Sequence, residues 1–134
     1  MPVLPHVLIV DDDADLRSAL SISLQSEGHS VIEVANGQLA LDALASGPPL
    51  ALIILDLMMP VMDGTAFLAQ KARGPGRAIP VVIFSSSPSA GLDGLAGVFS
   101  VVSKLEGIEG LLAAVRHAER SGPGRYASAG AFLA

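Results

Sequence analysis

Hydrophobic and polar positions along the chain follow two periods that replace each other in turn. Short apolar runs, such as "LALIIL" at residues 50–55, alternate with longer segments in which Leu and Ala recur every three or four positions. The first pattern is typical of buried strands and the second of amphipathic helices. The apolar runs predict strands at 6–10, 30–35, 50–55, 81–84 and 98–103, and the helical spacing predicts helices at 13–28, 37–47, 64–74, 90–97 and 108–121.

Five strands in regular alternation with five helices predict an α/β fold. The expected architecture is a doubly wound, five-stranded parallel sheet with right-handed crossover helices on both faces. The run at 50–55 is apolar throughout, as expected for a strand that is covered on both sides. Asp13 is a candidate N-cap for the first helix. The segment 90–97 contains three glycines, so the fourth helix is expected to be short.

The length of 134 residues corresponds to about one domain. We expect residues 1–121 to form it. Residues 122–134 are rich in Gly and Ala and are expected to be a tail or the stump of a linker.

Composition excludes several kinds of function. The chain has no cysteine, which rules out disulfides, thiolate nucleophiles and cysteine metal sites. A net charge of −5 argues against direct binding to nucleic acid, which requires clustered Lys and Arg. No apolar stretch reaches membrane-spanning length, and "MPVLPHVLIV" lacks the features of a signal peptide, so a cytoplasmic location is the expectation.

Polar side chains follow the predicted strands at the edge where ligands bind in such folds. Ligands collect outside the carboxyl ends of the strands. The residues delivered there are Asp11, Asp12 and Asp13 after the first strand, Asp56 after the third, Ser85 after the fourth and Lys104 after the fifth.

Converging carboxylates raise one another's pKa unless a cation lies among them. Oxygen ligands that leave room for water and a phosphoryl oxygen suit Mg²⁺. A lysine and a hydroxyl beside that ion are partners for a dianionic group. The pattern therefore predicts a Mg²⁺ site that binds a phosphoryl group.

These residues resemble the receiver domains of two-component response regulators, which are CheY-like, over about residues 5–120. The resemblance rests on five motifs that appear in order: "VLIVDDDADLR", "VANGQLAL", "LIILDLMMPVMDG", "PVVIFS" and "VVSKL". Each motif alone is weak, but each falls at a strand end or in the turn after it, which makes the series specific.

The resemblance implies a role for each site residue. Asp56 would accept a phosphoryl group from a partner histidine kinase, a phosphotransfer protein or a small phosphodonor. Asp12, Asp56 and the Met58 backbone carbonyl would bind Mg²⁺, and Asp11 would act through water. Lys104 would pair with the acceptor, and Ser85 would contact the phosphoryl oxygen. Phosphorylation would switch a protein-binding surface that acts on a downstream target or a fused output domain.

Two positions depart from the family pattern. Receivers usually have proline after the lysine, in a cis peptide bond, whereas Leu105 stands here. A cis bond before another residue costs about 2.5–4 kcal/mol, so we expect a trans bond and a reshaped loop. The switching aromatic position is Val101, and Phe99, on the same side of the strand by the period of two, is the candidate substitute.

Other functions remain open on the sequence alone. A pseudo-receiver that only binds proteins is favoured by Leu105, Val101 and the short fourth helix. A flavin-binding protein would need a first loop less acidic than "DDDAD". A haloacid dehalogenase-like phosphatase would need a second aspartate where Met58 stands. The sequence indicates a signalling switch rather than an enzyme, and it leaves the oligomeric state undecided.

Overall fold

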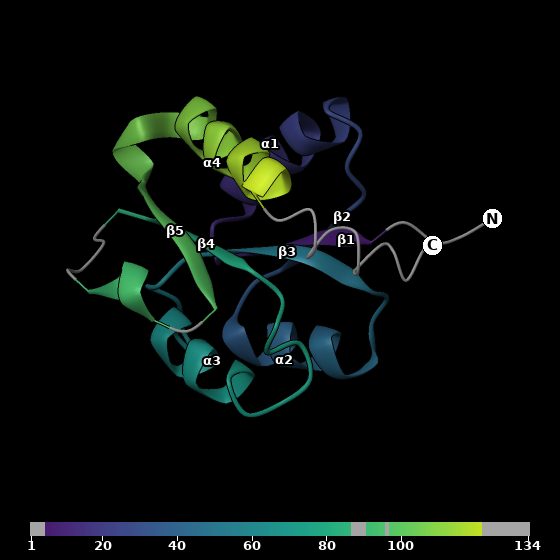
Figure 1. The fold of residues 1–134 in the computed structure, drawn as a ribbon, viewed down its shortest axis with the longest axis vertical. Coiled ribbons are helices and arrows are strands. Elements are labelled where there is room, and N and C mark those ends of the chain that lie inside the picture. The colour runs from purple at the N-terminus through teal and green to yellow at the C-terminus, as the bar shows by residue number, and fades with distance from the viewer. Residues whose placement is uncertain (1–4, 87–90, 96, 122–134) are drawn as a thin grey trace.

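The computed structural model describes residues 5–86, 91–95 and 97–121. Its centre is one parallel sheet with the strand order β2-β1-β3-β4-β5, which confirms the predicted α/β class (Figure 1). The sheet is doubly wound, because β2 lies on one side of β1 whereas β3, β4 and β5 follow on the other side. The strands are β1 (His6–Val10), β2 (Val31–Val34), β3 (Leu50–Leu55), β4 (Val81–Ser85) and β5 (Val98–Ser103).

Helices cover both faces of the sheet. In Figure 1, α1 and α4 lie above the sheet and α2 and α3 lie below it. Each face has its own hydrophobic cluster, one packed against α1 and α4 and the other against α2 and α3. The helices are α1 (Ala14–Ser26), α2 (Gly37–Ser46), α3 (Gly64–Lys71) and α4 (Gly107–Ser121).

The central strands supply side chains to both clusters. Val7 and Ile9 of β1 belong to the cluster under α1 and α4, whereas Leu8 and Val10 belong to the opposite one. All six residues of β3 are buried. Continuous apolar runs are therefore required here, because successive side chains of a strand point to opposite faces.

Side-chain caps begin three of the helices. Asp13 accepts hydrogen bonds from the backbone N–H groups of Asp15 and Leu16, which confirms the predicted N-cap of α1. Asn36 and Asp63 cap α2 and α3 in the same way. These caps fix where each helix starts after its strand.

The segment 90–97 is expected to hold a fourth helix that is short or partly melted, and its described part contains no α-helix. Residues Leu92–Gly94 form a single 3-10 turn, η1. Gly91, the residue before the turn, has a left-handed φ of 87°, and Gly97, after it, has a φ of 85°. Glycine adopts this conformation without the steric cost of a side chain, so it interrupts the helix on both sides.

Two expectations concern the chain outside these elements. The predicted tail at 122–134 lies outside the described residues. Among the described helices, none combines the length and the apolar character that crossing a membrane requires.

Candidate functional site

Asp56 lies at the carboxyl end of β3, in the middle of the sheet. Its backbone N–H donates to the Val10 carbonyl at 2.9 Å, which continues the pairing with β1 by one residue. The side chain is buried, and the whole residue is 4% exposed. A carboxylate therefore stands where the apolar strand ends, held in place by the central strands.

Two further carboxylates come from the end of β1. The Asp11 N–H donates to the Val34 carbonyl at 3.2 Å, and the buried Asp11 Oδ1 accepts from the Asp13 N–H at 2.9 Å. Asp12, the next residue, is exposed. Ligand oxygens of Asp11, Asp12 and Asp56 all lie within 4.8 Å of one another. The convergence predicted from the sequence is thus present.

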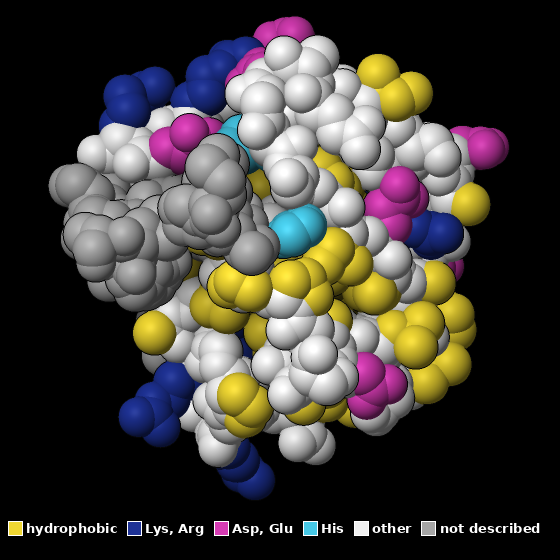
Figure 2. All heavy atoms as spheres, turned by 90° about the vertical axis from the view of Figure 1, so that its right-hand side faces the viewer, with side chains coloured by type: hydrophobic (Ala, Val, Ile, Leu, Met, Phe, Trp, Pro, Cys, Tyr) yellow, Lys and Arg dark blue, Asp and Glu magenta, His cyan; other side chains and the backbone are white. Residues whose placement is uncertain are grey.

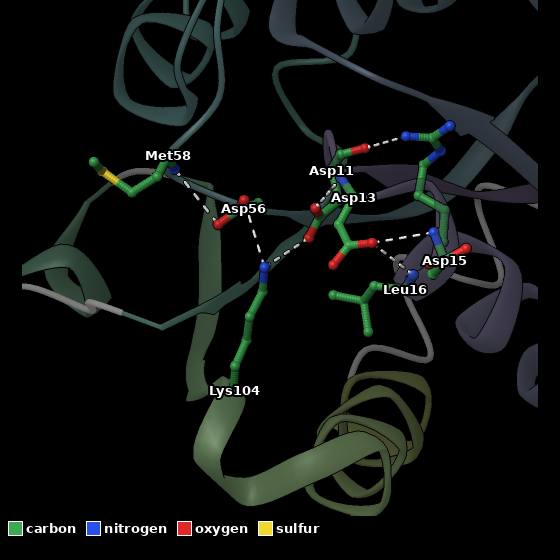
Figure 3. Close-up of polar contacts among 8 residues, drawn as sticks. Asp11, Asp13, Asp15, Leu16, Asp56, Met58 and Lys104 are labelled. Carbon is green, nitrogen blue, oxygen red and sulfur yellow. Dashed lines mark hydrogen bonds and ion pairs between the residues drawn. The ribbon is translucent and has the colours of Figure 1, made fainter.

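Lys104 reaches this cluster from the end of β5. Its Nζ lies 2.9 Å from Asp11 Oδ2 and 3.5 Å from Asp56 Oδ2. Figure 3 shows the lysine extending between the two carboxylates, with its ammonium group at its tip. The ammonium is therefore shared between two acidic groups and is closer to Asp11.

The electrostatics of the cluster follow from burial and from these neighbours. Burial, together with the charge of Asp11, raises the pKa of Asp56 above its ordinary value, although Lys104 opposes the shift. Burial alone would lower the pKa of Lys104, but the hydrogen bonds and charges of Asp11 and Asp56 outweigh it and raise that pKa. One ammonium thus partly compensates a group of carboxylates.

The loop after β5 differs from the family pattern in the predicted way. No cis peptide bond occurs in the described part of the chain, so Lys104 and Leu105 are joined by a trans bond. The residues Lys104–Glu106 form the 3-10 turn η2. Ser103 Oγ accepts from the Leu105 N–H at 3.1 Å, and Glu106 Oε2 accepts from the Ser103 N–H at 3.0 Å. This capping box positions Lys104 without a proline.

Ser85 is brought to the same edge of the sheet. It is the last residue of β4, it is fully buried, and its register partner on β5 is Ser103. Ser85 thus lies at the carboxyl edge of the sheet, beside the strand that leads to Lys104, which is the position predicted from the sequence.

Met58 lies in the loop that leaves β3. Its backbone N–H donates to Asp56 Oδ1 at 3.4 Å, and its side chain is largely exposed. The same loop requires a glycine at position 64, because a Cβ there would collide with the Asp56 carbonyl. The Gly64 N–H also donates to the Leu57 carbonyl at 3.0 Å, which closes the loop next to Asp56.

Arg17 supports the site in a way that the sequence did not reveal. Its guanidinium Nη1 donates to the Asp11 carbonyl at 2.6 Å, and its Nε lies 3.5 Å from Glu33 Oε1 at the end of β2. The arginine therefore ties the backbone of Asp11 to two elements. The place of Arg17 one turn into α1, close in sequence to Asp11, is the feature from which its contact with the site could have been predicted. Its second partner, Glu33 on β2, is distant in sequence and could not be predicted from the local pattern.

The expectation that Phe99 substitutes for a switching aromatic is wrong. Val81 pairs with Val98 and Val82 with Ser100, so Phe99 is an extra residue in the β5 ladder. Val101 packs on the face of α2 and α3, whereas Phe99 packs on the other face. There its ring contacts that of His117 in α4 edge to face, with the centroids 5.4 Å apart. The bulge breaks the period of two on which the expectation depended.

The donor set fits a hard divalent cation. The cluster offers three carboxylates, two of them buried, and within the described ranges Lys104 is the cation that pairs with the two buried ones, Asp11 and Asp56. Oxygen ligands with one exposed member suit Mg²⁺, which retains several waters. The chemistry of the residues present is therefore compatible with the predicted metal.

The sequence matches the response regulator receiver domain family over residues 7–116. It is 39% identical over 116 residues to the response regulator MprA of Mycobacterium tuberculosis, covering 83% of this chain and 49% of that protein. The MprA of Mycolicibacterium vanbaalenii is 38% identical over 121 residues, covering 87% of this chain and 50% of that protein. The chain spans about half the length of these curated relatives.

Solved structures agree with this match. A response regulator receiver protein from Pseudomonas putida has a TM-score of 0.78 and 25% identity, covering 87% of this chain and 99% of that one. The response regulator TrrA of Thermotoga maritima, solved in complex with Mg²⁺ and BeF, has a TM-score of 0.75 and 25% identity, covering 86% and 99%. With an acidic cluster and a lysine at the carboxyl edge of a five-stranded parallel sheet, the chain belongs to the receiver domain family of two-component response regulators.

Proposed function

We propose that this receiver domain accepts a phosphoryl group on Asp56 in a Mg²⁺-dependent reaction and thereby switches a protein-binding surface. The observation that carries the proposal is the position of Asp56, a buried carboxylate between Asp11, Asp12 and the ammonium of Lys104. A nucleophile with adjacent acidic groups and one cation is suited to phosphoryl chemistry, in which catalysis is mainly positioning and charge compensation.

In the proposed reaction an Asp56 carboxylate oxygen attacks the phosphorus of the donor. The bond from phosphorus to the donor's nitrogen or oxygen breaks, and its electron pair stays with the donor. Bound Mg²⁺, held by Asp12, Asp56 and the Met58 carbonyl with Asp11 acting through water, would supply positive charge to the phosphoryl oxygens. Lys104, already 3.5 Å from Asp56, adds a second positive charge.

Ser85 and Lys104 provide the response to phosphorylation. A phosphoryl group adds up to about two negative charges at Asp56. Lys104 then has a stronger partner than Asp11, and Ser85 at the end of β4 offers a hydroxyl to a phosphoryl oxygen. Movement of these residues changes the loops after β3 and β4, and with them the surface that a partner contacts.

The partners follow from this role. The donor is a histidine kinase, a phosphotransfer protein or a small phosphodonor, and the receiver of the signal is a protein target or a fused output domain. The protein acts in the cytoplasm, binds neither nucleic acid nor membrane directly through this domain, and promotes only its own phosphorylation and dephosphorylation. A pseudo-receiver is the alternative, but the Asp11–Lys104–Asp56 cluster favours the phosphorylated form of the family.

A titration with Mg²⁺ followed by beryllofluoride, read from backbone amide resonances, tests the proposal. We expect shifts at Asp56, Met58, Ser85 and Lys104 that saturate only when both additives are present. Asp12→Asn is expected to weaken the Mg²⁺ step, whereas Asp42→Asn, an exposed carboxylate on α2, serves as the matched control. Equal shifts in Asp12→Asn and in the control would contradict the proposed metal site.

A further inference from the structure

Asp12, the exposed member of the acidic cluster, has no side-chain contact that fixes its position. Within the described ranges, no hydrogen bond or ion pair involves its carboxylate. Asp11 and Asp56, in contrast, are buried and lie next to the ammonium of Lys104. The direction of the Asp12 carboxylate therefore depends on the backbone that carries it.

The backbone before Asp12 is held by a side chain of α1. The peptide that joins Asp11 to Asp12 contains the Asp11 carbonyl, which accepts from Arg17 Nη1 at 2.6 Å. In the part of the chain that the structure describes, no backbone N–H donates to this carbonyl. Because a peptide group is planar, the direction of the carbonyl fixes the plane from which Asp12 starts. Figure 3 shows the carbonyl directed away from Lys104, on the opposite side from the Asp11 carboxylate.

Arg17 is in turn held by Glu33 on β2. Its Nε lies 3.5 Å from Glu33 Oε1, which is the distance of an ion pair. The second oxygen of that carboxylate, Oε2, accepts from Ser21 Oγ of α1 at 2.7 Å. The Arg17 side chain is half-buried, and its Nε is shielded from solvent. The donor to the Asp11 carbonyl is thus anchored to two elements.

We infer that Arg17 is a positioning residue for the proposed metal site: through the Asp11 carbonyl it orients the Asp12 carboxylate towards Mg²⁺. Glu33 keeps the arginine in place. The inference rests on the proposed function, because it concerns the affinity of that same site. Residues that hold the direct ligands of a metal ion typically contribute roughly 10–100-fold to its affinity.

The charge of Arg17 by itself would have the opposite effect on Mg²⁺. A positive group near an acidic cluster repels a divalent cation, so its removal would strengthen metal binding. Removal of a group that orients a metal ligand weakens metal binding instead. The direction of the change in affinity therefore distinguishes positioning from simple electrostatics.

Titration of the whole chain with Mg²⁺ alone, followed at the amide resonances of Asp56 and Met58, tests the inference. Arg17→Met is expected to raise the dissociation constant roughly 10–100-fold. Arg17→Lys keeps the charge but lacks the planar fork that spans the carbonyl and Glu33, so we expect a rise of at least about threefold. The phosphorylation rate of both variants at saturating Mg²⁺ should stay within about twofold of wild type, because Arg17 affects assembly of the site and not the transfer step.

Arg116→Met is the matched control. Arg116 of α4 pairs with Glu27, at the opposite end of α1 from Asp11. Figure 2 has the layer of α1 and α4 at its top, where dark blue and magenta side chains lie together. This variant also loses an arginine that joins two elements, yet its affinity for Mg²⁺ should stay within about twofold of wild type, as for an exposed pair.

Each outcome of the titration supports or overturns the inference. Equal or tighter Mg²⁺ binding by Arg17→Met overturns it, as do equal losses in Arg17→Met and Arg116→Met. Wild-type affinity in Arg17→Lys also overturns it, so the conservative variant tests the inference even if Arg17→Met fails to fold. Absence of Mg²⁺ binding by the wild type would overturn the proposed function and this inference together, whereas the other failures leave the proposed function intact.

Discussion

Asp56 combines two properties that oppose each other in the native protein. It lies at the end of a central strand, where the proposed reaction requires a charged nucleophile, and it is buried beside the like charge of Asp11. Burial and that charge raise its pKa, so the native state holds the proton to a higher pH than the unfolded chain does. The unfolding free energy therefore falls as pH rises from the unfolded pKa through the raised native one, and it remains reduced at pH 7.

Asp56→Asn is accordingly expected to stabilise the protein in Mg²⁺-free buffer at pH 7. The substitution removes a buried charge, while Lys104 keeps its closer partner, Asp11. We expect a gain of about 1 kcal/mol in the unfolding free energy, measured by urea denaturation. Asp42→Asn, which neutralises an exposed aspartate, should change it by less than about 0.5 kcal/mol. A loss of stability in Asp56→Asn would show that the carboxylate is stabilised by its surroundings.

Lys104 has the complementary role, because it is the cation that compensates Asp11 and Asp56. Lys104→Met leaves two buried carboxylates facing each other, which should cost roughly 1–3 kcal/mol of unfolding free energy without metal. Mg²⁺ should restore more stability to this variant than to the wild type, because the ion compensates the same charges. Thermal melts with and without Mg²⁺ measure both effects. Equal stabilisation of the two proteins by Mg²⁺ would mean that the lysine and the metal do not share these carboxylates.

At the scale of elements, the turn η2 fixes the backbone at Lys104, where most receivers have a proline after the lysine. Ser103 Oγ accepts from the Leu105 N–H, a donor that a proline at 105 would lack. Ser103→Ala should therefore lower the unfolding free energy by about 1 kcal/mol, as is typical for loss of an N-cap. It should also slow phosphorylation of Asp56, because Lys104 is the first residue of the turn.

The control for this substitution is Ser26→Ala. Ser26 donates to the Ser23 carbonyl at the exposed end of α1, away from Asp56. We expect that variant to phosphorylate at the wild-type rate. If Ser103→Ala loses stability but keeps that rate, then the capping box does not position Lys104.

At the end of α3, the buried charge of Lys71 lowers the unfolding free energy by an amount that can be measured. Burial lowers the pKa of Lys71 from 10.5 to about 8, so between these values the unfolded chain binds more protons than the native one. The unfolding free energy thus rises with pH through this window. Lys71→Met, in phosphate-free buffer, should be more stable than the wild type at pH 7 by roughly 2–3 kcal/mol, which follows from 1.36 kcal/mol per pKa unit.

This difference should shrink as the pH rises from about 8 towards 10.5, because the wild-type lysine then loses its proton in the folded state. Urea denaturation at a series of pH values measures it. A difference between Lys71→Met and wild type that does not vary with pH would contradict the buried-charge account.

Elements with a uniform pattern were predictable, and those that depend on a single irregular residue were not. The continuous apolar run of β3 and the capped start of α1 at Asp13 gave correct predictions. The fourth helix was expected to be short, yet left-handed glycines at 91 and 97 reduce its described part to one 3-10 turn. The bulge at Phe99 could not be read from the sequence, because a ladder register depends on the neighbouring strand.

At the scale of the whole molecule, the fold explains why most of the site was predictable. Parallel strands bring their carboxyl ends to one edge, so residues that follow β1, β3 and β5 must meet there. Asp11, Asp56 and Lys104 do meet, as Figure 3 shows. The supporting contact from Arg17 and the burial of Lys71 arise from packing between elements distant in sequence, and local periodicity carries no information on those.

The intact mass of the protein after incubation with Mg²⁺ and acetyl phosphate tests the central claim most directly. Our account predicts the addition of one phosphoryl group to the wild type, and none to Asp56→Asn or to a sample treated with a chelator. Addition of the group to Asp56→Asn, or no addition to a wild-type sample that has been saturated with Mg²⁺, would contradict the proposal that this receiver is phosphorylated on Asp56.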